Sequence, residues 1–482
     1  MNPIAFGPEI FALVLAGVFL IFSMLRPDAR RDYLTALCLT AIGIGVAMTG
    51  LRAEGSLFHG VYRVDLFSQV FKALLLMGLF LVVCLCSDPR GVDEKRHPEF
   101  YLLLSVCTLS MMMLASAVHL LTLYMALELS SYSLYILVFL RQEGAPDASG
   151  SRRGYGVDAG IKYFLVGASA SAVMLFGMAL LYGSTGAMEL VRLMEIVPGR
   201  IGEPVVAAGL AMILCGFFFK LAVFPFHFWA PDVYEGAANP VAAYVSTASK
   251  VAAIAVLIRV TALAGNGSDA LAHVLVALAI VSMTVGNLSA IVQKDLKRLL
   301  AFSSVAHGGY VMIGILAMSA AGYAGAIFYA LAVLLMQFTC FLVVVVVADD
   351  GRNLRVDELA GLHRRSPVLA LALMMALFGL AGIPPTIGFT GKLLVFLAAM
   401  ERGYLVLILV AMINVVISLY YYLLVVRAAY LLEPETEPAP LRVAPGIRLL
   451  AGSLVAAMVV VGFYPAPLID MAVSAARMLY FH

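Results

Sequence analysis

Charged residues are scarce in this sequence. Only 12% of its 482 residues are Asp, Glu, Lys or Arg, whereas 63% are hydrophobic. Because a soluble domain typically carries about 25% charged residues, this composition excludes an ordinary soluble protein. The net charge of +2 does not define a partner, since the charges lie in loops between apolar runs. We expect a lipid bilayer around the chain and no nucleic-acid partner.

Cofactor motifs are also lacking. The sequence has no His-Glu-x-x-His motif, no Cys-x-x-Cys motif and no Gly-x-Gly-x-x-Gly after a strand. The segment GFTGKLL resembles part of a phosphate loop, but no Ser or Thr follows Lys392. The cysteines lie in apolar runs without zinc or iron–sulfur spacing: Cys38, Cys84, Cys86, Cys107, Cys215 and Cys340. We therefore expect no metal and no cofactor bound by this chain.

Apolar segments long enough to cross a bilayer recur along the whole chain. Each has about 20 residues, the length of a transmembrane helix, and we expect about fourteen of them. The expected spans lie near 5–24, 33–51, 66–86, 100–118, 120–140, 159–182, 205–228, 240–264, 270–292, 298–318, 322–348, 367–399, 404–432 and 448–469. The pattern predicts an all-α, polytopic membrane protein.

Lysine and arginine are unevenly divided between alternate loops. One set of loops holds about 20 of these residues and the opposite set about 7. Because basic loops stay on the cytoplasmic side, both termini are expected on the outer side of the membrane. The remaining basic residues fall inside predicted spans: Lys72, Lys220, Lys250 and Lys392.

Two predicted spans contain helix-breaking residues next to a lysine. The first break lies near 214–240, where Pro225 and Pro231 follow Lys220, and the second lies near 367–399, where two prolines precede Lys392. Proline removes a backbone donor, and unsatisfied backbone at membrane depth is tolerated only against protein or a watery cavity. Both breaks therefore indicate a polar pathway.

The breaks are about 160 residues apart and divide the chain into similar parts. We expect N-terminal helices 1–3 in 1–99, a five-helix repeat in 100–264, a second in 265–432, and helix 14 in 433–482. An odd number of helices per unit makes the two repeats inverted, and paired broken helices in inverted repeats are typical of transporters.

Ionisable side chains inside the spans form the candidate site. They are Glu128, Lys220, Lys250, His307 and Lys392. Burial disfavours the charged form of lysine and a nearby carboxylate favours it, so a lysine balanced between the two can exchange protons near neutral pH. Histidine exchanges protons near neutral pH with little change of its pKa. A Glu128–Lys220 pair followed by the other three residues would form a proton path.

Other interpretations of these residues stay open. Lys72 could extend to the membrane interface, and Lys392 could be a helix-end residue. Glu128 could be a structural partner of a lysine, and His307 could be a buried histidine satisfied by a serine. Asp232 and the nearby Glu235 are expected to cap the helix that restarts after the first break, with a role in proton uptake as the alternative.

Four segments resemble the antiporter-like membrane subunits of respiratory complex I, the proton-pumping NADH:quinone oxidoreductase. They read LYMALELSSYSLYIL, FFFKLAVFPFHFWAPDVYEGAANPVAAYVSTASKVAA, NLSAIVQKDLKRLLAFSSVAHGGYVMIG and LAGIPPTIGFTGKLLVF. The resemblance covers essentially the whole chain and is greatest to subunit N, the counterpart of mitochondrial subunit 2. Subunit L continues into a long lateral helix after span fourteen, whereas this sequence ends soon after that span. It has Lys392 where subunit M typically has glutamate, and its early Pro-Glu-Ile also resembles subunit N. The mitochondrial counterpart lacks three N-terminal helices, so the expected set of about fourteen helices resembles that of the bacterial proteins.

The resemblance implies a role for each site residue. Glu128 and Lys220 would be the glutamate–lysine pair, Lys250 the central connecting lysine, His307 a polar residue between two half-channels, and Lys392 the terminal lysine. NADH, FMN, iron–sulfur clusters and quinone would be bound by other subunits. Subunit M would lie on one side and small membrane subunits on the other, in the inner (plasma) membrane of a bacterium with both termini periplasmic.

The sequence thus favours a proton-translocating subunit of NADH:quinone oxidoreductase. The alternative is a subunit of a multisubunit cation/proton antiporter or of a membrane-bound hydrogenase, since these share the motifs. A structural spacer in the membrane arm is a third hypothesis.

Overall fold

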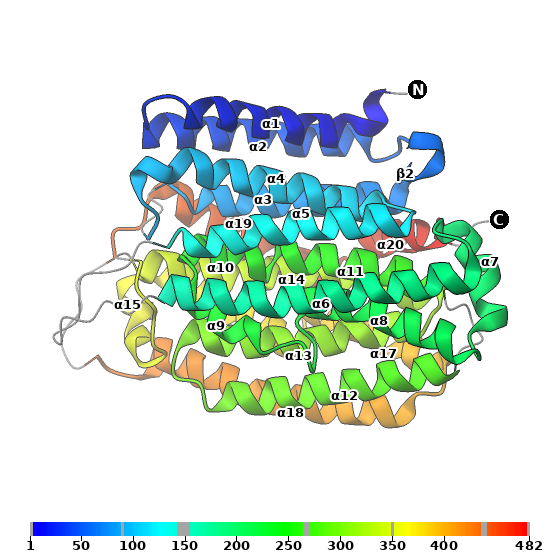
Figure 1. Cartoon of the computed structure of the whole chain (residues 1–482). Helices are drawn as coiled ribbons and strands as arrows, with labels where there is room; N and C mark the ends of the chain where they lie inside the picture. The colour runs from blue at the N-terminus through cyan, green and yellow to red at the C-terminus, as the bar shows by residue number, and fades with distance from the viewer. Residues whose placement is uncertain are drawn as a thin grey trace.

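The computed structural model describes residues 3–87, 91–141, 155–263, 269–348, 351–434 and 441–479. Long helices lie side by side in a bundle, and α1 begins at the same end of the bundle at which α20 ends (Figure 1). Within the described residues, thirteen helices are long and apolar enough to cross a membrane. The predicted all-α membrane architecture is confirmed.

The elements follow one another along the chain with short connections. The N-terminal part contains η1 Pro3–Phe6, α1 Gly7–Ser23, α2 Ala29–Gly50, β1 Gly55–Leu57, η2 Phe58–Gly60, β2 Tyr62–Val64 and α3 Leu66–Cys84. The middle part contains η3 Glu94–Arg96, α4 His97–Ser116, α5 Leu120–Phe139, α6 Tyr155–Thr185, α7 Leu190–Arg200, α8 Pro204–Leu221, α9 Trp229–Gly236, α10 Asn239–Ser246 and α11 Ala248–Thr261. The remainder contains α12 Asp269–Ile291, α13 Leu296–Leu316, α14 Ala320–Val347, η5 Asp357–Leu359, α15 Leu362–Arg365, α16 Pro367–Ala381, α17 Ile387–Glu401, α18 Leu405–Leu431, α19 Pro445–Phe463 and α20 Ala466–Arg477.

Local sequence explains where many helices begin. Asp28, Asp65 and Asp295 accept backbone N–H bonds at the starts of α2, α3 and α13, as N-cap residues do. Proline stands in the first turn of α8, α10, α16 and α19, where its missing donor costs nothing. These signals fix helix starts independently of the membrane.

The two predicted breaks end their helices in the same way. α8 ends before Ala222, which has a left-handed φ of 59°, and α16 ends before Gly382, with φ 86°. In each case the left-handed residue and the next one donate back to carbonyls of the last helical turn. After the break, the first segment restarts only as the short helix α9, whereas the second restarts as the longer α17. The predicted span 367–399 is therefore two half-helices.

Several details differ from the predicted spans. The span expected at 240–264 is interrupted at Thr247, between α10 and α11. The hydroxyls of Ser246 and Thr247 both bond to the carbonyl oxygen of Ala243, which competes with regular helix hydrogen bonding. A small antiparallel hairpin, β1–β2, and the helices α7 and α20 are additional elements that the sequence did not predict.

The most buried helices lie in the centre of the bundle. The α10–α11 segment is wholly buried, and α13 and α14 are mostly buried, whereas less than half of α1, α2, α12, α18 and α19 is buried. Polar groups in the centre are therefore shielded from lipid by other helices. The division into two inverted five-helix units stays a prediction.

Candidate functional site

Lys220 lies in the last turn of α8 and is almost fully buried, with 2% of its surface exposed. Its ammonium donates a 2.8 Å hydrogen bond to Ser130 Oγ of α5. Glu128, two residues earlier on α5, is half-buried and accepts a hydrogen bond from Ser171 Oγ of α6. Among the described residues, Glu128 and Lys220 form no direct ion pair. In this conformation each of the two side chains binds a serine, and their role as a pair stays a prediction.

Lys250 lies on α11, directly after the interruption at Thr247. Its ammonium donates a hydrogen bond to the carbonyl oxygen of Leu221, the last residue of α8. The Trp229 ring of α9 lies 5.8 Å from the same ammonium, within cation–π range. Lys250 therefore lies against the first break and contacts the residue that follows Lys220.

Lys392 has the corresponding position at the second break. Its ammonium donates hydrogen bonds of 2.8 and 3.0 Å to the carbonyl oxygens of Leu380 and Ala381, which end α16. It also lies 4.5 Å from the centre of the Tyr310 ring. Lys392 is buried in the sixth position of α17, so it is part of the helix and not a residue that extends from the helix end.

His307 lies on α13, buried between two tyrosines. Its Nδ1 is 2.6 Å from Tyr329 Oη and its Nε2 is 3.2 Å from Tyr422 Oη, and the latter hydroxyl also contacts Ser303 at 2.5 Å. The partners that satisfy the ring are therefore tyrosines, and a serine takes part only through one of them. Two hydroxyls on opposite ring nitrogens give the imidazole a route for proton exchange on each side.

The helices that carry these residues pack in the order of the predicted path. α8 packs on α11, α11 on α13, and α13 on α17 (Figure 1). α13 approaches the first break at Gly308, next to His307. A Cβ added there would lie 2.9 Å from Val223 Cγ1 and 3.5 Å from the Leu221 carbonyl oxygen that Lys250 binds. Glycine at this position brings the histidine helix against the first break.

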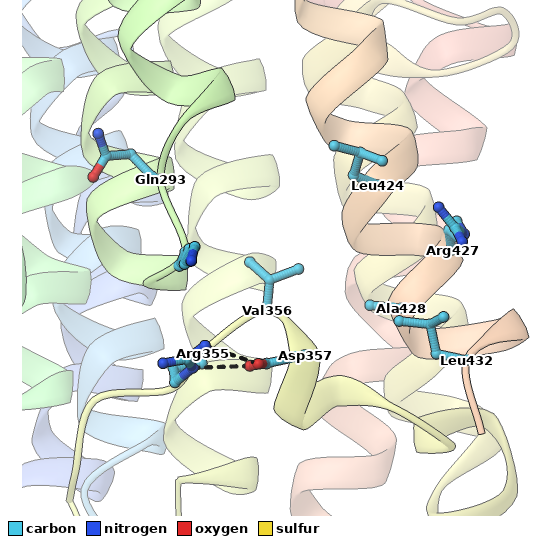
Figure 2. Close-up of a pocket in the computed structure, with 9 residues that line it drawn as sticks. Gln293, Arg355, Val356, Asp357, Leu424, Arg427, Ala428 and Leu432 are labelled. Atoms are coloured by element: carbon cyan, nitrogen blue, oxygen red, sulfur yellow. Dashed lines mark hydrogen bonds and ion pairs between the residues drawn. The ribbon is translucent and has the colours of Figure 1, made fainter. Parts of the chain in front are cut away.

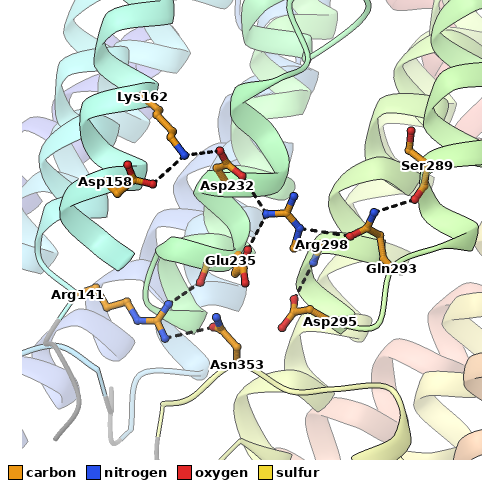
Figure 3. A network of polar contacts seen from close by, with 10 residues as sticks. All are labelled: Arg141, Asp158, Lys162, Asp232, Glu235, Ser289, Gln293, Asp295, Arg298 and Asn353. Carbon is orange, nitrogen blue, oxygen red and sulfur yellow. Dashed lines mark hydrogen bonds and ion pairs between the residues drawn. The ribbon is translucent and has the colours of Figure 1, made fainter. Parts of the chain in front are cut away.

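Asp232 and Glu235 have a different role from the predicted helix cap. α9 has no side-chain cap hydrogen bond at its start. Instead Arg298 bonds to Asp232 at 2.9 Å and to Glu235 at 2.7 Å, and Lys162 bonds to Asp232 at 2.9 Å (Figure 3). The prediction failed because partners from α6 and α13 reach these carboxylates. The network connects the end of the first broken helix to both of these helices.

Two buried cations outside the predicted site, Lys297 and Arg259, have structural partners. Lys297 bonds to the Ala237 carbonyl oxygen and to Asn239 Oδ1, each at 3.0 Å. Arg259 forms an ion pair with Asp65, with both side chains 2% exposed. Neither was among the basic residues expected inside the spans.

Lys72, whose position was left open, is fully buried and pairs with Glu9 at 2.5 Å. Tyr62 donates to the same carboxylate oxygen of Glu9, also at 2.5 Å. The interfacial interpretation of Lys72 is therefore wrong. Because α1 supplies the carboxylate and α3 the ammonium, the pair joins the N-terminal helices.

No group of three or more His, Cys, Asp or Glu side chains in the described part of the chain could hold a metal ion. The cationic site is instead built from lysines, backbone carbonyls, hydroxyls and one imidazole. Such a set can hold and exchange protons.

Comparison with known proteins decides the family. The model of the family described as NADH:quinone oxidoreductase/Mrp antiporter, TM, matches residues 117–418. The chain is 60% identical over 480 residues to "NADH-quinone oxidoreductase subunit N 2" of Syntrophobacter fumaroxidans, covering 99% of this chain and 100% of that protein. The chain belongs to the subunit N family of NADH-quinone oxidoreductases. As a member of this family it is a membrane-arm subunit of complex I.

Solved structures agree with membership of the subunit N family. A chain of respiratory complex I from Thermus thermophilus with bound aureothin is similar with a TM-score of 0.82 and 32% identity, over 96% of this chain and 98% of that one. A chain of the Mrp complex from Dietzia sp. DQ12-45-1b is similar with a TM-score of 0.88 over 100% of this chain and 98% of that one, at 21% identity. The second likeness shows a shared fold. The membrane arm is an assembly of several subunits, and this chain is one of them.

Proposed function

We propose that this subunit translocates protons along a path formed by Glu128, Lys220, Lys250, His307 and Lys392. The electron transfer that drives it takes place in other subunits, which bind NADH, FMN, the iron–sulfur clusters and quinone. The neighbouring subunits are subunit M on one side and small membrane subunits on the other. The chain lies in a bacterial inner membrane with both termini on the periplasmic side, as the distribution of basic loops favours.

One observation carries this proposal. Lys250 and Lys392, which come from different helices, both donate to carbonyl oxygens at the end of a broken helix. The last four carbonyls of a helix have no partner within it, and the negative end of the helix dipole favours a cation there. A buried lysine at such a site has a polar environment that stabilises its protonated form without a carboxylate.

The serine contacts of the first two residues support a switch between two arrangements. Lys220 donates a hydrogen bond to Ser130, which lies two residues after Glu128 on α5, and Glu128 accepts one from Ser171. The two ionisable side chains are therefore near each other but share no hydrogen bond. In the proposed cycle, Glu128 leaves Ser171 and approaches Lys220, which stabilises the lysine's proton. When Glu128 returns to Ser171, Lys220 loses this stabilisation and releases the proton toward Lys250.

The second half of the path uses His307 between the two breaks. Its ring nitrogens contact Tyr329 and Tyr422, and its neighbour Gly308 abuts the first break. A proton released by Lys250 would pass through ordered water and the imidazole to Lys392. Water is needed in this scheme because hydrogen-bonded chains move protons only over contacts of hydrogen-bond length.

The test is a Lys220→Ala variant of the intact complex in sealed vesicles. Proton pumping driven by NADH should fall sharply or vanish, because the variant removes the first lysine of the proposed path. The control is Lys95→Ala, which removes an exposed lysine of η3. Full pumping together with near-normal quinone reduction in the Lys220→Ala variant would remove Lys220 from the path.

A further inference from the structure

A pocket of about 370 Å³ lies away from the proton path, at the ends of α12 and α18 (Figure 2). It is bounded by the loop between α12 and α13, the segment that leads into η5, and the last turns of α18. The first two of these elements are held together, because the Val356 N–H donates a 2.9 Å hydrogen bond to the Lys294 carbonyl oxygen. α12 and α18 also pack on each other at the periphery of the bundle. The pocket is therefore a built feature between three fixed walls.

Its polar lining is cationic. Lys294, Arg355 and Arg427 line it together with a single carboxylate, Asp357. Arg355 holds that carboxylate at 2.9 Å, and this hydrogen bond keeps the pKa of Asp357 below its usual range. Three cations and one ionised carboxylate leave a net charge of +2. In the described part of the chain, the side chains of Lys294 and Arg427 have no hydrogen-bond or ion-pair partner.

The opposite wall is apolar and continues onto the outside of the bundle. Leu424 and Leu432 line the pocket, and Leu423 and Leu431 of the same helix end are exposed. Apolar residues of α18 are exposed in other turns as well, among them Leu409, Ile413 and Val416, so this helix presents an apolar face along its length. An occupant with an anionic group and a long apolar part would match both walls.

We propose that this pocket binds the headgroup of an anionic phospholipid. The phosphate would accept hydrogen bonds from Lys294 and Arg427, and the acyl chains would lie along the exposed face of α18. The cations lie at the end of a membrane helix, where lipid headgroups are, and basic pockets between such helices are suited to anionic lipid headgroups. Free phosphate would bind the cations but would not contact the apolar wall. An acidic protein segment would leave the exposed apolar face of α18 uncovered. A lipid uses both.

The test uses the intact complex in detergent, labelled with a photoactivatable phosphatidylglycerol. The Lys294→Gln/Arg427→Gln double variant should reduce labelling of this subunit near α18 about 30-fold, since each basic residue near the surface contributes roughly a fivefold preference. The matched control is Arg442→Gln/Arg448→Gln, which removes two exposed cations from the same set of basic loops and should leave labelling unchanged. A phosphatidylcholine analogue should label the site weakly.

A second variant, Leu432→Gln, keeps the charges and makes the exposed apolar wall polar. It should also reduce labelling, which a site for free phosphate would not show. Equal labelling of the double variant and its control would overturn the proposal. So would complete competition by millimolar inorganic phosphate, or a cross-link from Lys294 to an acidic segment of a neighbouring subunit that excludes the lipid.

Discussion

Lys250 donates a hydrogen bond to the carbonyl oxygen of Leu221, the residue that directly follows Lys220. The central lysine is thus anchored to the end of the helix that carries the first lysine. Lys392 makes the same kind of contact at the end of α16. The helix before each break, α8 or α16, supplies carbonyl oxygens to a lysine outside it, which explains how these buried ammonium groups are accommodated without a carboxylate in contact.

The serines that hold the first pair should matter for pumping. Ser130→Ala removes the hydroxyl that accepts from Lys220, and Ser171→Ala removes the one that donates to Glu128. Losing one such hydrogen bond costs about 1 kcal/mol, so each single variant should change the pumping rate roughly fivefold. The measurement is initial proton uptake in sealed vesicles at saturating NADH.

If the two serines act on one switch, the double variant should differ from the product of the single effects. Ser453→Ala on α19 is the control, because that exposed hydroxyl bonds only to its own helix. Unchanged pumping in all three serine variants of the site would show that these hydrogen bonds have no part in transfer.

Gly382 allows a test of the Lys392 position. Its φ of 86° disfavours alanine, and a Cβ added there would lie 3.0 Å from Lys392 Cδ. Gly382→Ala should therefore destabilise the subunit by about 1–2 kcal/mol and also displace the lysine from its carbonyl partners. Pumping should fall while NADH oxidation with an artificial acceptor is kept.

Gly403→Ala is the matched control for the backbone strain. Gly403 has a φ of 80°, but no atom lies within 4 Å of the added Cβ. This variant should show the same loss of stability without the loss of pumping. Equal pumping in the two glycine variants would contradict a role for the Lys392–carbonyl contact.

The Glu9–Lys72 pair should stabilise the N-terminal helices. Glu9→Gln leaves the fully buried ammonium of Lys72 without its carboxylate, and breaking a buried pair in this way costs about 3–5 kcal/mol. We expect the intact Glu9→Gln complex to disappear from native gels at a lower temperature than the unmodified complex. The Glu9→Gln/Lys72→Met double variant should recover much of the loss, because it removes the uncompensated charge.

The exposed ion pair between Arg200 and Glu203 provides the comparison for Glu9→Gln. Glu203→Gln should have little or no effect, because a solvent-exposed pair contributes little to stability. A Glu9→Gln complex as heat-stable as the Glu203→Gln complex would show that Lys72 does not depend on Glu9.

Much of the fold was predictable because it depends on local properties. Apolar length marks the spans, prolines near a lysine mark each break, and a lysine inside a span is unusual, so Lys220, Lys250 and Lys392 could be identified without coordinates. The break at Thr247 was missed, since hydroxyls in a helix often bond to the preceding turn without interrupting it. α7 was missed because its 11 residues are too short to span a bilayer.

Contacts between distant helices were not predictable in the same way. The serine partners of Lys220 and Glu128 come from α5 and α6, and nothing in the local sequence specifies which hydroxyl approaches which ion. The same limit explains Asp232, a carboxylate at a helix start that binds a distant arginine instead of capping. The early glutamate of Pro-Glu-Ile was noticed, but its pairing with Lys72 depends on how α1 packs near α3.

The most direct test of the proposed path is the number of protons pumped per NADH oxidised by a Lys250→Met variant in sealed vesicles. Methionine keeps much of the apolar volume but cannot donate to Leu221, so the two halves of the path would be disconnected. We predict a clear fall in protons per NADH relative to Lys95→Ala, with the complex still assembled and quinone reduction retained. An unchanged ratio would contradict the proposal that protons pass through the lysine at the first break.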